Sequence, residues 1–258
     1  MTFNMLSYGG GTNSTAMLVG LHERGLRPDL ILFADTGGEK PQTYEHVRVV
    51  SEWCESVGFP AVITVQTQNR AGEYYTLEQR CLDNKMLPSI AYGFKACSEK
   101  HKRRPQDKYV NNWQPAKDVW ASGQKVVKLI GYDADESRRA KIADDTRYVY
   151  QYPLIQWDWG RDECVDAIAR AGLPQPGKSA CFFCPSSKKA EVLDLVNNHP
   201  ELFARAAAME INADLHTIKG LGRNYSWREL VAANTAQSVL FPESGVSVDC
   251  GCYDGDEE

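Results

Sequence analysis

Residues 3–25 read FNMLSYGGGTNSTAMLVGLHERG and carry three signals of secondary structure. The apolar run at 3–8 is typical of a buried strand, and the glycines that follow it predict a tight turn. A helix is expected from Asn13, which suits an N-cap, to Gly25, which suits a C-terminal stop. A strand, a glycine-rich turn and a helix are therefore expected in direct succession.

The segments that follow repeat this alternation. Residues 30–34 form a continuous apolar run, which is typical of a strand buried on both faces of a parallel sheet. A second helix is expected from Pro41 to about Gly58, and a third strand at 61–65. Alternation at this spacing implies right-handed crossovers. The sequence thus predicts an α/β fold with a doubly wound, mainly parallel sheet.

The rest of the chain changes in character along its length. Residues 125–131 predict a fourth strand and 147–152 an edge strand, whereas the chain after residue 161 is typical of helices. We expect a nucleotide-binding α/β domain at 1–155 and a mainly helical C-terminal region at 156–258. The further helices are expected at 73–80, 105–113, 161–172, 186–198 and 200–214.

The composition is that of an ordinary globular protein. The 258 residues are 43 % hydrophobic and 24 % charged, and the formal net charge of −5 argues against a protein that coats nucleic acid. Two basic stretches, 95–104 and 138–147, still allow a local anion-binding groove. There is no apolar run of about 18 residues, and residues 1–8 do not have the pattern of a signal peptide. We therefore expect a cytoplasmic protein with no membrane partner.

The glycine-rich turn is a candidate anion site. Three glycines at 9–11 let the backbone approach an anion, and the helix after them points unpaired N–H groups in the same direction. Thr12 and Ser14 add hydroxyl donors. The alternative is a tight turn without a ligand, since neither a Walker A nor a dinucleotide-binding pattern is present.

A second loop is expected at the same edge of the sheet, because it follows the second strand. This loop, residues 35–39, reads DTGGE. Asp35 or Glu39 is a candidate to hold Mg²⁺ on a triphosphate or to bond a ribose hydroxyl. The alternative is that Asp35 caps a helix.

The chain has eight cysteines, which we expect to be reduced thiols. Cys181 and Cys184 form a CxxC pair and are the strongest candidate metal ligands, because thiolates suit zinc and iron–sulfur clusters. Their spacing alone does not distinguish these two kinds of site. The further candidate ligands are Cys97, Cys250 and Cys252. The cysteines expected in apolar packing are Cys54, Cys81 and Cys164.

Several short motifs, taken together, resemble a known family. Residues 9–14 (GGGTNS) resemble the PP-loop, SGGxDS, of ATP pyrophosphatases, and residues 35–43 resemble the DTGxxxPET segment of the phosphoadenylyl-sulfate (PAPS) reductase branch. The other elements that are similar to that branch are C…KxxP at 97–105, GxRxxES…R at 131–139, PLxxW at 153–157 and CxxC at 181–184.

Three positions depart from the family pattern. Gly9 stands in place of the first PP-loop serine and Asn13 in place of its aspartate, which weakens the expectation that ATP is cleaved. Asp133 stands in place of the arginine of the GxR element, which removes one expected anion contact.

The resemblance implies an adenine nucleotide, ATP or PAPS, with Mg²⁺ as a possible companion. The expected catalytic residues are Asp35, Cys250 and Cys252. The expected nucleotide-binding residues are Ser7, Gly9, Gly10, Gly11, Thr12, Asn13, Ser14, Asp35, Thr36, Gly37, Lys102, Gly131 and Arg138.

The resemblance also implies an iron–sulfur cluster, with a 4Fe–4S cluster favoured and zinc as the alternative. Its expected ligands are Cys97, Cys181, Cys184 and one of Cys250 and Cys252; the alternative to a fourth ligand is an open iron that holds sulfide or substrate. In PAPS reductases a C-terminal Cys-Gly attacks the sulfonate sulfur, and the CGC at 250–252 is similar. We favour a ligand over a nucleophile here, because the neighbouring Asp249 would raise the thiol pKa.

Three classes of function remain. The leading hypothesis is an enzyme that adenylates an acceptor, for which a nucleic acid is the candidate, and transfers sulfur to it from a donor such as a cysteine desulfurase. The second is a sulfonucleotide reductase that releases sulfite and takes electrons from a thioredoxin-like partner. The third is a nucleotide or nucleic-acid binding module with a structural zinc and no enzymatic activity.

Overall fold

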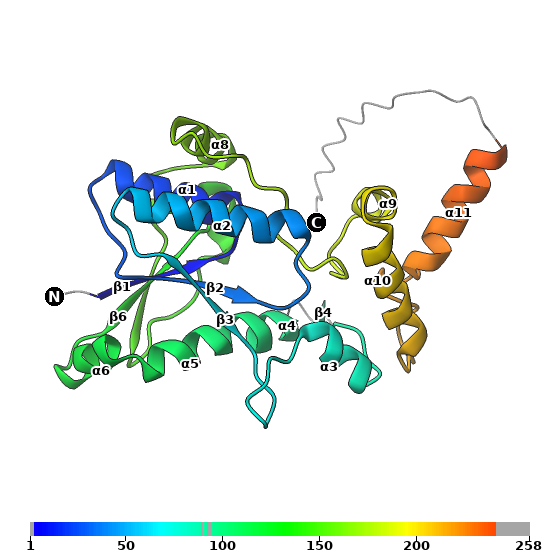
Figure 1. Cartoon of the computed structure of the whole chain (residues 1–258), viewed down its shortest axis with the longest axis horizontal. Helices are drawn as coiled ribbons and strands as arrows, with labels where there is room; N and C mark the ends of the chain where they lie inside the picture. Colours follow the sequence, from blue (N-terminus) through cyan, green and yellow to red (C-terminus); the bar gives the residue numbers. More distant parts are fainter. Residues whose placement is uncertain (1–2, 89, 92–93, 241–258) are drawn as a thin grey trace.

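The computed structural model describes residues 3–240 except 89, 92 and 93. Five parallel strands form one sheet in the order β3-β2-β1-β6-β7 (Figure 1). The predicted α/β fold is confirmed. The strands are β1 (Phe3–Tyr8), β2 (Leu30–Asp35), β3 (Val62–Gln66), β6 (Val126–Ile130) and β7 (Tyr148–Gln151).

The two faces of the sheet are covered by different helices (Figure 1). One face carries α1 (Thr12–Glu23), α2 (Pro41–Ser56) and α8 (Arg161–Arg170), and the other carries α5 (Arg104–Asn112) and α6 (Gln114–Ala121). Because side chains alternate along a strand, β1 supplies both cores. Its Leu6 and Tyr8 pack on the α1 side, whereas Phe3 and Met5 pack on the α5 side.

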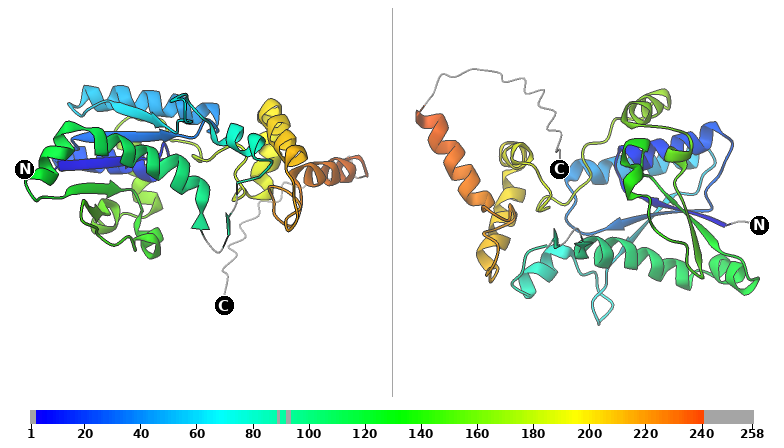
Figure 2. Two further views of the ribbon diagram at one scale, coloured as in Figure 1. Left: turned by 90° about the horizontal axis from the view of Figure 1, so that it is seen from below. Right: turned by 180° about the vertical axis from the view of Figure 1, so that it is seen from behind.

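A helical C-terminal part lies beyond the carboxyl edge of the sheet (Figures 1 and 2). It contains α9 (Lys189–Asn198), α10 (Pro200–Asn212) and α11 (Trp227–Leu240). Its core is shared with α3 (Leu77–Asp83), which comes much earlier in the chain. The prediction for α9 was wrong at its start, because the helix begins at Lys189 and not at 186. Helix α11 and the helix α6 were not predicted.

Short elements complete the described chain. The strands β4 (Ile90–Ala91) and β5 (Phe94–Lys95) pair with each other and lead into α4 (Ala96–Ser98). A π-helical turn, η1 (Glu99–Arg103), then continues into α5. The 3₁₀ turn η2 (Ala134–Arg139) and the helix α7 (Pro153–Gln156) follow β6 and β7. Within the described ranges, every helix is too short or too polar to cross a bilayer.

Candidate functional site

The strand order changes direction at β1. The chain passes from β1 to β2 and β3 on one side, and then continues with β6 and β7 on the other side. In open parallel sheets such a switch point separates two loops and creates a crevice outside the carboxyl ends of the strands. Here Gly131, directly after β6, lies against the start of α1. A Cβ atom at Gly131 would be 3.1 Å from the backbone nitrogen of Ser14.

The loop after β1 adopts a conformation that needs glycine. Gly10 has a φ angle of +72°, in the left-handed region, and a Cβ atom there would be 3.1 Å from a methyl carbon of Thr43. Gly11 is the N-cap residue of α1 and provides no side-chain cap. The Ser14 hydroxyl accepts a hydrogen bond from the Gly9 N–H at 3.1 Å and donates one to the Gly11 carbonyl at 3.1 Å. The turn therefore leaves the first N–H groups of α1 facing the crevice, as anion binding requires.

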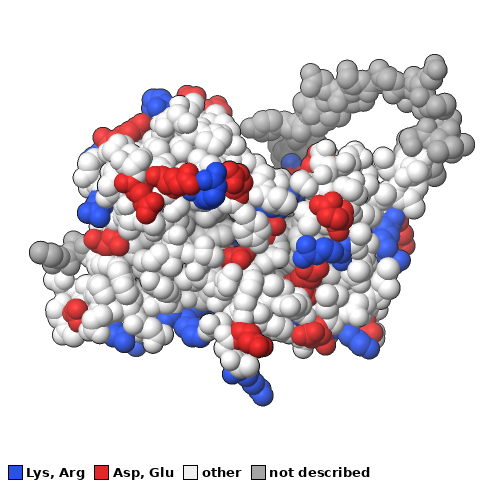
Figure 3. All heavy atoms as spheres, in the orientation of Figure 1, with Lys and Arg blue, Asp and Glu red and all other residues white. Residues whose placement is uncertain are grey.

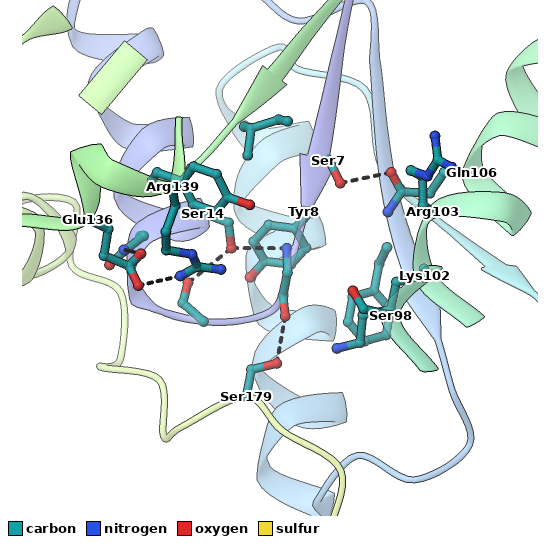
Figure 4. A pocket seen from close by; sticks show the side chains of 18 of the residues that line it. Ser7, Tyr8, Ser14, Ser98, Lys102, Arg103, Gln106, Glu136, Arg139 and Ser179 are labelled. Atoms are coloured by element: carbon teal, nitrogen blue, oxygen red, sulfur yellow. Dashed lines mark hydrogen bonds and ion pairs between the residues drawn. The ribbon is translucent and has the colours of Figure 1, made fainter. Parts of the chain in front are cut away.

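A cavity of 1390 Å³ occupies this edge of the sheet (Figure 4). Its lining includes two glutamates, Glu99 and Glu136, against a larger number of cations. The cations are Lys95, Lys102, Arg103, Lys128, Arg139, Lys141, Arg161 and Lys178. Figure 3 shows acidic and basic side chains interspersed on the face in view. A cavity with this lining suits an anionic ligand.

Most of the predicted nucleotide-binding residues line this cavity. Those that do are Ser7, Gly9, Gly11, Thr12, Asn13, Ser14, Lys102 and Gly131. Those that are not part of the lining are Gly10, Asp35, Thr36, Gly37 and Arg138.

Arg139 lines the cavity in place of Arg138. These neighbours lie on the 3₁₀ turn η2, where successive side chains point about 120° apart. The Arg139 guanidinium stacks 4.3 Å from the ring centroid of Tyr132 and pairs with Glu136. The sequence does not fix the phase of this turn, which is why the prediction named Arg138 whereas the structure places Arg139 in the cavity lining.

Asp35 is held by four donors. One carboxylate oxygen accepts from the Gly37 N–H at 2.7 Å and the Tyr44 hydroxyl at 2.8 Å. The other accepts from the Gln66 amide at 3.1 Å and the Tyr74 hydroxyl at 2.9 Å. The side chain caps no helix, and its hydrogen bonds fix the loop after β2 to β3 and α2. The predicted role of Asp35 in holding Mg²⁺ would require it to exchange some of these partners.

Asn13 and Asp133 form a direct pair beside the cavity. The Asn13 amide donates to an Asp133 carboxylate oxygen at 2.8 Å, and its carbonyl accepts from the Arg161 guanidinium at 3.4 Å. Burial raises the pKa of Asp133, whose other oxygen accepts from the Glu136 N–H at 2.9 Å. Arg161 thus places a cation beside the loop after β1, and sequence reasoning did not identify it.

The CxxC loop is docked on the loop that follows β2. The Phe182 N–H donates to the Gly38 carbonyl at 2.7 Å, and the Thr36 hydroxyl lies 3.1 Å from the Cys181 sulfur. A tight turn closes between the two cysteines, because the Cys184 N–H donates to the Cys181 carbonyl at 3.0 Å. Cys184 is within electrostatic range of both Cys181 and Cys97 on α4, so the three thiols lie in one region.

The three described candidate ligands influence one another electrostatically. Burial raises the pKa of the Cys181 thiol to about 12, and the Glu39 carboxylate adds to this effect. Burial also raises the pKa of Cys97, and the charge of Cys184 contributes to the raised pKa of both Cys97 and Cys181. In the part of the chain that the structure describes, no three His, Cys, Asp or Glu side chains are already arranged to hold a metal ion. The predicted fourth ligand, Cys250 or Cys252, lies outside the described residues. The catalytic role predicted for these two cysteines therefore stays a prediction.

Glu39 connects the cavity to the cysteine loop. Its buried carboxylate pairs with Lys102 at 2.9 Å, and its other oxygen accepts from the Ser179 hydroxyl at 3.4 Å. Ser179 also donates to the Gly9 carbonyl at 2.6 Å. Burial opposes protonation of Lys102, but Glu39 and the thiols of Cys181 and Cys184 outweigh it and raise the Lys102 pKa. A charge on either side of Glu39 is therefore felt on the other.

The remaining cysteines are part of the packing, as predicted. Cys54, Cys81 and Cys164 are at most 1 % exposed, and burial raises the pKa of each thiol to about 12. These thiols are protonated at neutral pH and are poor ligands and nucleophiles.

Comparison of the whole sequence with models of known protein families and with curated proteins gives no match.

Proposed function

We propose that the protein is an enzyme of the PP-loop type that binds ATP in this cavity, adenylates an acceptor and transfers sulfur to it. The observation that carries the proposal is the meeting of three features at one edge of the sheet. A glycine-rich loop at a helix N-terminus, a cavity whose charged lining residues are mostly cations, and a loop with two cysteines all lie there. The motif resemblance in the sequence supports the same assignment.

The chain's own residues account for the binding of a triphosphate. The N–H groups at the start of α1 would bind phosphate oxygens, and the Ser14 hydroxyl would hold the loop in shape. Arg139 and Arg161 would neutralise the charge that develops when pyrophosphate leaves the α-phosphorus. In the first step the acceptor oxygen forms a bond to the α-phosphorus, and the bond from that phosphorus to pyrophosphate breaks. In the second step sulfur at the sulfide level attacks the acceptor atom that carries this oxygen, and the bond to oxygen breaks with AMP as the leaving group.

The thiols of Cys97, Cys181 and Cys184 fit a thiophilic metal centre by their chemistry. Sulfur is the preferred donor for iron–sulfur clusters and for zinc, and the CxxC turn presents two donors from one short loop. A 4Fe–4S cluster on these thiols would supply bound sulfur or electrons. Cys250 or Cys252 is the fourth residue that we propose for this centre.

The acceptor that we propose is anionic, and a nucleic acid is the favoured class. Lys95 and Lys141 both line the cavity, are exposed and form no ion pair among the described residues. They would bind phosphates of an acceptor that extends from the cavity. A cysteine desulfurase is the class of partner that would renew the sulfur.

The test is a product analysis on the full chain prepared without oxygen. Incubation with ATP and Mg²⁺ should yield AMP and pyrophosphate, with water taking the place of the acceptor, and Arg139→Ala should lower the rate at least about tenfold by removing charge stabilisation. Lys117→Ala, which changes an exposed residue on α6, is the matched control and should leave the rate unchanged. Absence of nucleotide binding would reject the proposal.

A sulfonucleotide reductase is the second candidate, and the position of Lys102 favours it. This cation lines the cavity and is also within electrostatic range of Cys181 and Cys184, so it lies between a bound anion and the thiols. Release of sulfite from PAPS with a thioredoxin-like reductant would support this candidate. Iron and sulfide analysis of the protein and of Cys181→Ala separates both enzymes from a module that contains only zinc.

A further inference from the structure

Ser7 and Gln106 form a polar pair inside the cavity. The Ser7 hydroxyl, at the end of β1, donates to the Gln106 side-chain carbonyl at 2.8 Å. Both residues line the cavity, and Figure 4 shows them on the side away from Glu136 and Arg139. Gln106 is only 4 % exposed, which is unusual for a polar residue unless its groups are satisfied.

The amino group of Gln106 is available to a ligand. Its carbonyl end is occupied by Ser7, and among the residues that the structure describes no hydrogen bond uses its amino end. The amino nitrogen is not fully buried, and because Gln106 lines the cavity this nitrogen is open to it. A buried amide that is held at its carbonyl end and free at its amino end can form specific hydrogen bonds with the polar edge of a ligand ring.

Charge is distributed differently at the two ends of the cavity. Near Gln106, Lys102 and Arg103 are paired with the carboxylates of Glu39 and Glu99, so their charges are largely neutralised. Near Asn13, Arg139 is likewise paired with Glu136, but the Arg161 guanidinium is bonded by an uncharged amide oxygen, and the N–H groups at the start of α1 add partial positive charge. The phosphates of a nucleotide are therefore best accommodated at the α1 end, and an uncharged part of it at the Gln106 end.

The walls beside Gln106 suit a flat, weakly polar group. Pairing between β1 and β2 ends at Tyr8 and Phe33, so the sheet opens at Ala34. Ala34 lines the cavity from β2, on the face of the sheet that carries α5, and Ile130 lines it from β6 beside Ser7. Apolar walls with one convergent amide are typical of a site that binds and orients a ring.

We propose that Gln106 reads the base of the bound nucleotide and selects adenine, with Ser7 as the residue that positions its amide. The proposal rests on the proposed nucleotide-binding function. An amide donates to a purine ring nitrogen through its amino group and accepts from the 6-amino group through the free lone pair of its carbonyl. A 6-oxo purine presents an acceptor where the amide carbonyl also presents one, so it is bound less well.

The experiment compares the binding of ATP and ITP to the full chain by calorimetry, without divalent cations so that neither is consumed. The wild-type protein should prefer ATP by about tenfold or more, which is the discrimination expected of one amide–base pair. Gln106→Leu removes both groups of the amide and should abolish the preference. Gln106→Glu keeps an acceptor opposite the 6-position but loses the donor, so it should weaken the binding of both nucleotides and retain a preference for ATP. Ser7→Ala should reduce the preference by a smaller factor, because the amide is still present but less well oriented.

Lys178→Ala is the matched control at the other end of the cavity, where Lys178 pairs with Glu191. It should weaken the binding of ATP and ITP by the same factor and leave their ratio unchanged. If ATP binds and Gln106→Leu keeps the full preference, the assignment of Gln106 is wrong while the nucleotide site stands. If neither nucleotide binds the wild-type protein, the proposed function and this inference fail together.

Discussion

At the scale of single residues, the two unusual positions next to the cavity compensate each other. Asn13 and Asp133 stand where the motifs that they resemble have an aspartate and an arginine. In the structure the Asn13 amide donates to Asp133 at 2.8 Å and to Glu136 at 3.3 Å. An aspartate at position 13 would place a third carboxylate against Asp133 and Glu136 in place of the amide donor, so Asn13 is the residue that fits Asp133.

A double-mutant cycle tests this pairing. Asn13→Asp should destabilise the protein by about 1–3 kcal/mol, because it replaces a donor by a like charge at buried acceptors. Asp133→Asn in the same chain should recover most of that loss, because the new amide can donate in the reverse direction, to the carboxylate introduced by the first substitution. Equilibrium urea unfolding of the two single variants and the double variant gives the coupling. Additive losses would contradict the pairing.

His101 gives a prediction for the dependence of stability on pH. The ring is 1 % exposed, and among the described residues neither of its nitrogens has a partner. Burial, with smaller effects of Arg80 and Lys100, lowers its pKa to about 4. The unfolded chain therefore binds a proton that the folded protein does not. The contribution of His101 is complete above the unfolded pKa of about 6.5 and declines as the pH falls towards 4.

Between pH 6.5 and pH 5, His101 should cost the protein about 2 kcal/mol of its free energy of unfolding. The buried His46, whose pKa is also lowered by burial, should add a smaller loss in the same direction. Urea unfolding at the two pH values measures the sum. His101→Leu should remove its share of the slope, whereas His216→Leu, at an exposed position, should not. An equal slope in all three proteins would contradict the assignment.

At the scale of elements, the carboxylate of Glu210 organises the C-terminal helices. It is 4 % exposed and accepts from the backbone N–H groups of Leu221 and Trp227, both at 2.8 Å. One side chain on α10 thereby fixes the loop before α11 and satisfies the first turn of that helix. A Cβ atom at Gly220 would lie 2.4 Å from the same carboxylate, so the loop can approach it only with glycine at this position.

Glu210→Ala should destabilise this part of the protein by about 2–4 kcal/mol, because it leaves two buried N–H groups without an acceptor. Limited proteolysis should cut the chain between α10 and α11 faster in the variant, and urea unfolding should show the loss of stability. Glu201→Ala, on the exposed first turn of the same helix, is the matched control. Equal proteolysis of both variants would show that Glu210 does not hold this loop.

The helix α11 shows what the sequence signalled and what it did not. Ser226 and Glu229 form reciprocal hydrogen bonds at 3.1 Å, which is the capping box S-x-x-E, and this pattern at 226–229 could have predicted the start of the helix. The role of Glu210 could not be found in the same way, because it lies 17 residues from Trp227 in sequence. Local signals predicted most elements, whereas contacts between distant residues determine how they are joined.

At the scale of the whole molecule, the same contrast separates the fold from the site. The parallel sheet was predictable because buried strands and their helices repeat along 3–66. The glycine loop was found for the same reason, since its residues are contiguous. Arg161 and Gln106 were not found, because each reaches the cavity from a helix that is packed there by tertiary contacts. The contact between the CxxC loop and Gly38 likewise could not be predicted from a local sequence pattern, because it joins residues that are far apart in the chain.

This docking predicts that the nucleotide cavity and the cysteines are energetically coupled through Glu39. If ATP binds as proposed, it should change the rate at which Cys184 is alkylated, because Lys102 and Ser179 contact both Glu39 and the cavity. A coupling of about fivefold or more is typical of linked sites. Glu39→Gln removes the charge that joins them and should bring the effect of ATP on alkylation close to none.

The control for this prediction is Glu191→Gln, because Glu191 pairs at 2.8 Å with another cation of the cavity, Lys178, and lies on α9. Each substitution removes the carboxylate that pairs with one lysine of the cavity, which leaves that lysine's charge available to the nucleotide. Both variants should therefore bind ATP at least as tightly as the wild-type protein does. Only Glu39→Gln should abolish the effect of ATP on Cys184, which mass spectrometry of the alkylated protein can follow residue by residue. If Glu191→Gln abolishes the effect equally, the coupling depends on the total charge of the cavity. If neither variant changes it, the signal does not pass through Glu39 and the contact between the two loops is only structural.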